Sequence, residues 1–506
     1  MKRKLSLNHN ILANYASQIY VTAVGILILP LYIKYMGAEA YGLVGFFAML
    51  QAWFALLDLG LTPTIGRETA RYHGGAMSAL AYRQLFRALS LIFAGIAVIG
   101  GGGLWLLSGV IATRWLNVAE LPVDDVVLAV QIMAISVALR WMGGLYRGVV
   151  TGSERLVWLS GFNALIATLR FIGVLASMWL FGFTPFVFFI HQLVVALVEI
   201  LGLFLMSLRL LPARSSLDHR IGWSLRPVRP LLKFALTIAF TSSLWVLVTQ
   251  IDKLVLSGIL PLAEYGYFTL AVLVAGGIMV VSGPISNAIM PRMARLHAEG
   301  KHDEMIEVYR NATQLVSIIC GSAAITLATC AEPLLFAWTG EAQLAAEAAP
   351  IMRLYAIGNG FLAISAFPYY LQYAIGNLRY HLIGSAGMAA VLIPSITFAA
   401  INHGGIGAGY AWLGNNAFSL LIWVAYVHHK FEPGLHVSWI VNDVARIIIL
   451  AMILPLVLLG LSIPPESRMQ SLVLVLGIAT IATAVSLALS STGKNWITRH
   501  IATSES

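Results

Sequence analysis

The sequence predicts an all-α protein that crosses a membrane about fourteen times. Of its 506 residues, 59% are hydrophobic and only 10% are charged, whereas a soluble globular domain carries about 25% charged residues. The mean hydropathy is +0.84. Apolar runs of about 20 residues, the length that crosses a hydrocarbon core, recur along the whole chain. This composition excludes a soluble globular protein.

The expected spans follow these apolar runs in chain order. Polar residues separate the basic N-terminus from the first run, and this run is long enough to span, so a cleavable signal peptide is not expected. The runs lie near 11–34, 40–63, 86–110, 126–147, 156–181, 185–209, 234–259, 265–290, 312–335, 350–375, 381–402, 406–428, 444–463 and 470–490.

Basic residues are distributed unequally between the two sides of the predicted bundle. Most of the 31 Lys and Arg residues fall on one side, and the other side holds only Lys34, Arg114 and Arg468. The positive-inside rule then places both termini in the cytoplasm. Basic loops that face anionic lipid also account for the formal net charge of +9, without a nucleic-acid partner.

A weak internal repeat indicates two lobes. Tyr41-Gly42 and Ala70-Arg71-x-His73 recur 224 residues later, as Tyr265-Gly266 and Ala294-Arg295-x-His297. Both copies start on the same side, so the lobes should be related by an axis along the membrane normal. A stretch rich in proline and arginine, residues 212–230, marks the boundary between the lobes. The expected organisation is an N-lobe of six helices at 1–211, a cytoplasmic linker at 212–230, a C-lobe of six helices at 231–432, and two further helices with a cytoplasmic tail at 433–506.

The end of the second span carries a lone carboxylate. Ala40 to Leu57 is almost wholly apolar, with Gln51 its only strongly polar side chain, and Asp58 follows directly. A carboxylate at that depth is costly unless it is paired or faces water. Asp58 is therefore either a functional group or a buried tether, and the sequence leaves both readings open.

Four basic residues lie inside predicted spans: Arg140, Arg170, Lys253 and Arg353. A charge at the bilayer centre costs at least about 2.5–3.5 kcal/mol, so they favour a water-filled cationic cavity that binds an anionic cargo. The alternative is that they form structural ion pairs or extend towards the membrane surface. For Arg170 the obvious structural partner is Glu199.

Other polar residues at helical spacing complete the predicted site. The polar cavity face is expected to comprise Asn14, Ser17, Gln18, Thr241, Thr249 and Asn163. The coupling or gating candidates are Asp58, Asp252, Glu199 and Pro284. Prolines and glycines within spans allow helices to bend, which suits alternating access.

The sequence offers no sign of an enzyme. The longest outer loop covers only about Ile111 to Asp125, and no nucleotide, zinc or nucleophile motif occurs in a convincing context. The run Gly100 to Gly103 lies inside a span, where it indicates close helix packing. We expect no catalytic residues, no metal and no cofactor.

Several short motifs lie in residues 11–75 and 250–300: Asn14, Ser17-Gln18, Leu29-Pro30, Gly37-Ala38-Glu39-Ala40-Tyr41-Gly42, Leu57-Asp58-Leu59-Gly60-Leu61, Arg67-x-x-Ala70-Arg71, Asp252-Lys253 and Tyr265-Gly266. They resemble those of the polysaccharide transporters of the multidrug/oligosaccharidyl-lipid/polysaccharide (MOP) exporter superfamily, especially O-antigen (Wzx-type) flippases. The resemblance implies a V-shaped pair of six-helix bundles in a bacterial inner (cytoplasmic) membrane. It also implies that this pair moves an undecaprenyl-pyrophosphate-linked oligosaccharide from the cytoplasmic to the periplasmic leaflet during lipopolysaccharide or other surface polysaccharide biosynthesis.

Differences between this sequence and related transporter families bear on the alternative functions. Lipid II flippases place arginines on the first helix, where this chain has Asn14 and Gln18. Drug exporters of the superfamily use mainly acidic cavities, which is the opposite balance. A lipid II-type flippase, another MOP exporter, a membrane glycan polymerase or ligase, and a non-transporting scaffold remain as alternatives.

The sequence leaves the driving force open. The membrane potential could act on the phosphate charge of the cargo, or a proton or sodium counter-ion could act through Asp58 or Asp252. Besides the lipid-linked glycan and membrane lipid, the resemblance implies a polysaccharide polymerase and chain-length proteins as partners.

Overall fold

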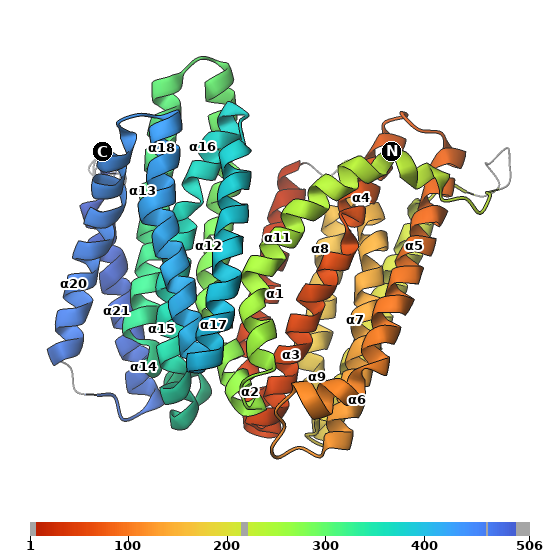
Figure 1. Ribbon diagram of the computed structural model, residues 1–506, viewed down its shortest axis with the longest axis horizontal. Coiled ribbons are helices and arrows are strands. Elements are labelled where there is room, and N and C mark those ends of the chain that lie inside the picture. Colours follow the sequence, from red (N-terminus) through yellow and green to blue (C-terminus); the bar gives the residue numbers. More distant parts are fainter. Residues whose placement is uncertain (1–6, 214–220, 462–463, 492–506) are drawn as a thin grey trace, which may run out of the picture. The chain divides into compact units, whose positions relative to one another are not determined.

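The computed structural model describes residues 7–213, 221–461 and 464–491, which are almost entirely helical. Within these ranges there is no strand, and one isolated bridge joins Asn117 to Pro261. Twelve described segments are long and apolar enough to cross a membrane. The predicted all-α polytopic architecture is confirmed (Figure 1).

The fourteen expected spans all fall on helices. Two details explain why only twelve segments satisfy the length and composition criteria for a span. The segment Arg379–Phe431 counts once, yet its backbone leaves the helical region at His403 and Gly404. It therefore contains two of the expected spans. The expected span at 350–375 coincides with two consecutive helices outside the twelve, α15 (Ala342–Ser365) and α16 (Phe367–Ile375).

The chain divides into two compact units, Met1–Gly266 and Tyr267–Ser506. The first unit contains α1 (Leu7–Leu27), α2 (Leu29–Met36), α3 (Ala38–Phe54), η1 (Ala55–Asp58), α4 (Leu61–His73), α5 (Ala79–Leu106), α6 (Ser108–Val110), η2 (Ile111–Trp115), α7 (Val123–Gly152), α8 (Leu156–Ala167), η3 (Thr168–Gly173), α9 (Val174–Phe181), α10 (Pro185–Leu210), η5 (Arg226–Leu231) and α11 (Leu232–Ser257).

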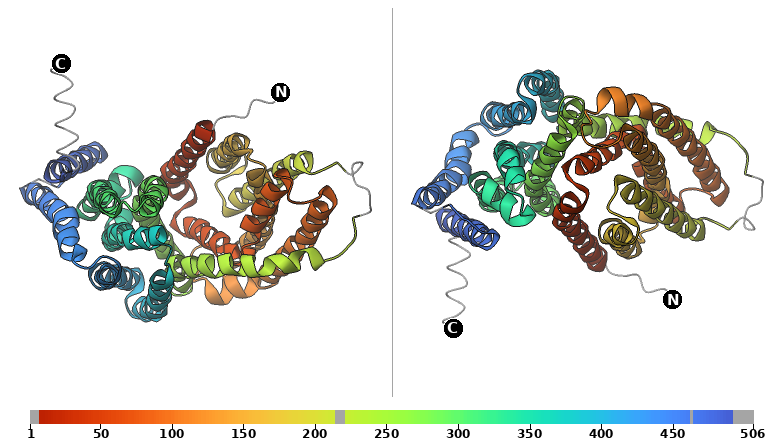
Figure 2. Two further views of the ribbon diagram at one scale, coloured as in Figure 1. Left: turned by 90° about the horizontal axis from the view of Figure 1, so that it is seen from above. Right: turned by 90° about the horizontal axis from the view of Figure 1, so that it is seen from below.

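The second unit continues α12, which begins in the first. Its last two long helices, α20 and α21, pack against each other (Figure 2) and against α13, and α21 also packs against α14. In chain order, the elements are α12 (Leu262–Ala298), α13 (His302–Thr329), α14 (Ala331–Thr339), α15, α16, α17 (Arg379–Phe418), η6 (Ser419–Trp423), α18 (Val424–Phe431), α19 (Leu435–Ser438), η7 (Trp439–Ala445), α20 (Arg446–Leu461) and α21 (Arg468–Leu489).

Helix starts follow recognisable sequence signals. The hydroxyl of Thr184 accepts a hydrogen bond from the backbone N–H of Val187, and Pro185 occupies the first turn of α10. Ser467 and Gln470 form a reciprocal capping box at the start of α21. Side chains thus satisfy backbone groups that a helix end would leave unpaired.

Close packing of α7 against α4 depends on glycines spaced four residues apart. A Cβ added at Gly148 would lie 2.8 Å from the carbonyl oxygen of Thr62, and one added at Gly152 would lie 2.2 Å from the carbonyl oxygen of Gly66. Such small residues let membrane helices approach backbone to backbone. They fix the position of α7, which carries two of the arginines described below.

Helix α11 packs within the first unit, against α3, η1 and α4 (Figure 1). The compact division therefore falls after α11, whereas the lobe boundary expected from the repeat lies before it, at 212–230. The assignment of lobes as transport domains remains a prediction.

The two repeated Tyr-Gly pairs meet where α3 and α12 begin. A Cβ at Gly42 would lie 2.0 Å from the carbonyl oxygen of Leu262, and one at Gly266 would lie 3.1 Å from that of Ala38. Tyr41 and Tyr265 are both buried. The glycines are therefore needed because the two helices touch through their backbones.

Candidate functional site

Arg140 lies near the middle of α7, and its side chain is only 8% exposed. Its guanidinium donates to the side-chain oxygen of Gln51 at 3.0 Å and to that of Gln192 at 2.9 Å. It also lies over the ring of Phe47, 5.4 Å from the centroid. Neutral acceptors and an aromatic face from two other helices, α3 and α10, thus contact this charge.

Arg147, two helical turns further along α7, makes the shortest ion pair to Glu199. Its guanidinium lies 2.8 Å from the carboxylate of Glu199 on α10, and it also donates to Asn163 on α8 at 2.8 Å. The other carboxylate oxygen of Glu199 is 3.9 Å from Arg140 Nε. Glu199 therefore serves two arginines, and Arg147 is the main partner.

Arg170 projects from η3, a π-helical turn between α8 and α9. Its guanidinium donates to Gln51 Oε1 at 3.1 Å and lies over the ring of Phe171, 5.2 Å from the centroid. The ion pairs of Glu199 are to Arg140 and Arg147. Among the described residues, Arg170 therefore does not form the direct salt bridge to Glu199 that the structural alternative requires.

Side chains from neighbouring helices bind the backbone of this π-helical turn. His191 bonds the carbonyl oxygen of Leu169 at 2.9 Å, and the Gln192 amide donates to that of Arg170 at 3.0 Å. The Tyr32 hydroxyl donates to that of Phe171 at 2.6 Å. Three successive carbonyl groups are thus fixed, and π turns often occur at functional sites.

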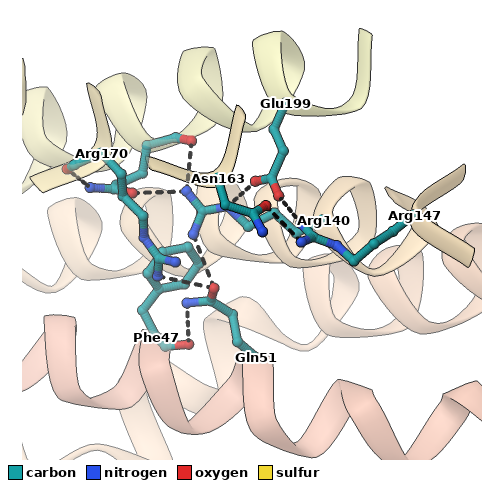
Figure 3. A network of polar contacts seen from close by, with 8 residues as sticks. Phe47, Gln51, Arg140, Arg147, Asn163, Arg170 and Glu199 are labelled. Atoms are coloured by element: carbon teal, nitrogen blue, oxygen red, sulfur yellow. Dashed lines mark hydrogen bonds and ion pairs between the residues drawn. The ribbon is translucent and has the colours of Figure 1, made fainter. Parts of the chain in front are cut away.

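We call Arg140, Arg147, Arg170, Glu199, Gln51, Gln192 and Asn163 the arginine network (Figure 3). It contains three guanidinium groups and one carboxylate, so two positive charges are in excess within it. Because arginine stays protonated in proteins, this excess persists at physiological pH. The arrangement is suited to an anion that carries several oxygen atoms.

The network includes glutamines that the sequence analysis did not place in the site. Gln51 bridges Arg140 and Arg170 through one oxygen atom. Its isolation in an apolar run was the available signal. Gln192 gave no comparable signal, since its role depends on how α10 packs against α7 and η3.

The other predicted cationic residues lie elsewhere. Lys253 donates to the carbonyl oxygen of Thr249 at 2.8 Å and lies 3.3 Å from the carboxylate of Asp252, which is buried. Arg353 is exposed on α15 in the second unit, with no hydrogen bond or ion pair to another described residue. The structure therefore brings together Arg140 and Arg170 with Arg147, whereas Lys253 has local partners.

The predicted polar face is divided between local contacts and exposed positions. Ser17 is buried and donates to the carbonyl oxygen of Ser160 at 2.9 Å. Asn14 and Gln18 are exposed, and half-buried Thr249 donates to the carbonyl oxygen of Trp245. The side chains of Thr241 and Pro284 lie outside the described part of the chain.

Asp58 has a local partner at the start of α4. Its carboxylate accepts hydrogen bonds from the backbone N–H of Thr62 at 3.2 Å and from the Thr62 hydroxyl. This geometry ties η1 to α4 across the turn at Leu59 and Gly60, which both have positive φ. The sequence left open whether Asp58 is a functional group or a buried tether, and its hydrogen bonds from Thr62 are those expected of a tether.

No group of three or more His, Cys, Asp or Glu side chains placed to hold a metal ion occurs among the described residues. The arginine network itself consists of cationic and neutral groups around one carboxylate. It is an anion-binding arrangement rather than a cation-binding one.

A family model described as polysaccharide biosynthesis protein matches residues 7–297. The chain belongs to this family. The match includes every residue of the arginine network, and it confirms the predicted relationship to polysaccharide transporters. No curated protein matches the sequence.

Solved structures show that this polysaccharide biosynthesis protein has the MOP superfamily fold. The lipid II flippase MurJ in an inward closed conformation is 14% identical, with a TM-score of 0.72 over 96% of this chain and 98% of that one. An inward-facing MATE family multidrug resistance transporter is 14% identical, with a TM-score of 0.64 over 81% and 94%.

A third structure is a MOP superfamily transporter from Pyrococcus furiosus, described as having a binding pocket of reverse polarity. It is 14% identical to this family member, with a TM-score of 0.52 over 83% of this chain and 95% of that one. At such identities the likeness establishes the fold alone.

Proposed function

We propose that the protein is a flippase for a lipid-linked oligosaccharide carried on undecaprenyl pyrophosphate. The observation that carries this proposal is the excess of two positive charges in the arginine network. A diphosphate offers several anionic oxygen atoms, and planar guanidinium groups bind such oxygen atoms well. Family membership and the fold support transport during polysaccharide biosynthesis.

The proposed cargo is an O-antigen or another surface polysaccharide repeat unit. The family described as polysaccharide biosynthesis protein favours a glycan cargo, and the first helix has Asn14 and Gln18 where lipid II flippases are expected to carry arginines. A lipid II-type precursor is the second candidate, favoured by the match to MurJ. Direct comparison of the two cargos decides between them.

In this proposal the two predicted lobes alternate access to the cavity across the bacterial inner membrane. Both termini lie in the cytoplasm, and the cargo moves from the cytoplasmic to the periplasmic leaflet. Pro284 is a hinge candidate within α12, and Asp58 and Asp252 are candidates for ion coupling. A polysaccharide polymerase and chain-length proteins would receive the flipped units.

The test is a leaflet-transfer assay in liposomes. Purified protein is reconstituted with a fluorescent undecaprenyl-pyrophosphate oligosaccharide, and transfer is followed by the loss of fluorescence on adding an impermeant quencher. We expect transfer to depend on the protein and to fall in Arg140→Gln and Arg170→Gln.

Arg155→Gln is the matched control, because Arg155 is exposed and outside the network. Equal rates in the network variants and the native protein would overturn the proposed role of the network. Faster transfer of a lipid II-type probe than of the oligosaccharide probe would replace the proposed cargo by the second candidate.

A further inference from the structure

The segment that leads into α11 combines exposed apolar side chains with two exposed arginines. Trp223 is 76% exposed and Leu225 is 56% exposed. Arg226 and Arg229 are also exposed and form no ion pair or hydrogen bond through their guanidinium groups to described residues. Residues 221–232 contain no acidic residue. We call these residues the basic segment.

The basic segment is held against the start of α5. Arg87 on α5 donates to the carbonyl oxygen of Ile221 at 2.6 Å, and its guanidinium lies 4.6 Å from the centroid of Trp223. Val228 is buried, and η5 packs on α5. The segment therefore has a defined place at one end of the first unit, beside the start of α11 (Figure 1).

This end of the unit lies at the boundary of two predicted spans. The span Ala79–Leu106 contains Arg87 in its first turns, and the span Ile238–Ser257 begins just beyond the segment. Exposed Leu232, Leu236 and Phe240 follow on α11. Because they are spaced four residues apart, they share one face of the helix. Trp223 and Leu225 thus precede an apolar face that continues into the span.

We infer that the basic segment binds the surface of an anionic phospholipid bilayer. Tryptophan favours the level of the lipid headgroups, and arginines next to a membrane attract anionic lipids. Charge complementarity identifies the occupant, because two cations in a described stretch that contains no acidic residue, 221–232, lie beside the side chains that would enter the interface. The inference is independent of the cargo proposed above.

The experiment places a fluorophore in the segment. Cys320 and Cys330 are buried and are replaced by alanine, so that a bimane label reacts only with Leu225→Cys, which keeps Trp223 in place. The labelled protein is incorporated into nanodiscs of phosphatidylcholine alone or with increasing phosphatidylglycerol. Emission wavelength and quenching by lipids brominated near the headgroup are measured.

We expect the emission to shift to the blue, and quenching to appear, as phosphatidylglycerol is added. In the double variant Arg226→Gln/Arg229→Gln, about threefold more phosphatidylglycerol should be needed to reach half of the emission shift, or that point should not be reached. The reason is that each arginine near the membrane surface adds attraction to anionic lipid. Arg155→Gln, which removes an exposed charge elsewhere, should behave like the parent. Phe240→Cys should be quenched in both membranes.

Three results would overturn the inference. Emission as in water in every nanodisc would mean that the segment does not touch the bilayer. Equal quenching with and without phosphatidylglycerol, unchanged by the double variant, would mean apolar contact without recognition of charge. A shift that follows protein concentration rather than lipid composition would mean that a second copy covers the segment. Gel filtration of each variant shows that it is folded.

Discussion

At the residue scale, Arg170 and Arg147 differ in what holds them. Arg170 hydrogen-bonds a neutral amide, Gln51, whereas Arg147 pairs with the carboxylate of Glu199. Removing Arg170 therefore strands no carboxylate, while removing Glu199 leaves the network without its anion. The Arg170 substitution should therefore chiefly affect transport, and the Glu199 substitution chiefly folding.

Arg170→Ala should slow transfer about tenfold to a hundredfold, which is the effect of losing a charged hydrogen bond of about 1.5–3 kcal/mol to the cargo. Its membrane abundance should stay near that of the native protein. Arg170→Lys should retain part of the activity, because the charge remains while the planar geometry is lost. Both are measured by the liposome assay and by quantitative immunoblotting of membranes.

A drop in Arg170→Ala abundance, with native transfer per folded molecule, would show a structural role instead. The double variant Arg170→Ala/Glu199→Ala adds a check. Recovery of both abundance and transport in that variant would mean that the arginine serves only to balance Glu199.

Glu199→Ala should chiefly lower stability. Breaking a fully buried ion pair by removing one partner typically costs about 3–5 kcal/mol. We expect a smaller cost here because the Arg147 side chain is 36% exposed, although the substitution leaves Arg140, Arg147 and Arg170 without a carboxylate. We expect a lower unfolding temperature in detergent, measured by the fluorescence of a thiol-reactive dye. Glu120→Ala, an exposed carboxylate at the end of the same unit, is the control and should unfold at the native temperature.

At the element scale, the contact between the starts of α3 and α12 depends on glycine. Gly42→Ala should destabilise the protein by about 1–3 kcal/mol, as overpacking does, because its Cβ would lie 2.0 Å from the carbonyl oxygen of Leu262. Gly95→Ala is the matched control, since no atom lies within 4 Å of its Cβ and helix propensity favours alanine. Thermal unfolding of both variants checks this prediction.

Sequence patterns predicted the helices well and their irregular turns poorly. Span length and apolar composition are local properties, so every expected span coincides with a helix. The π-helical turn at Thr168–Gly173 has no such local signature. It is stabilised by Tyr32, His191 and Gln192, whose positions depend on the packing of other helices.

The same distinction applies to the candidate site. Charged residues in spans were visible in the sequence, and two of the four, Arg140 and Arg170, join one network. Which acceptor each would find was not predictable, because their partners come from α3 and α10. Arg147 joins the same network, because Glu199 on α10 and Asn163 on α8 hold it.

At the scale of the whole molecule, the excess of positive charge bears on the driving force. If the cargo crosses with net negative charge, an inside-negative membrane potential favours its export by about 2.3 kcal/mol per charge for each 100 mV. We expect an imposed potential of this sign to accelerate transfer in liposomes at equal pH and sodium. Reversing the sign should slow it.

A proton or sodium gradient is the competing driving force. Transfer that follows such a gradient and ignores the imposed potential would contradict the prediction. Asp58→Asn and Asp252→Asn would then identify the coupling carboxylate. The hydrogen bonds of Asp58 to Thr62 predict that Asp58→Asn would mainly affect stability.

The side-chain oxygen of Gln51 occupies, within the arginine network, the position expected for an oxygen atom of the ligand. One amide oxygen accepts from both Arg140 and Arg170, which is the role that a phosphate oxygen would play. An arriving anion can displace this shared acceptor while Gln192 still holds Arg140, so the guanidinium groups are already oriented. The same arrangement predicts that a single-atom exchange, Gln51→Glu, would produce a self-inhibited protein, whose own carboxylate competes with the cargo.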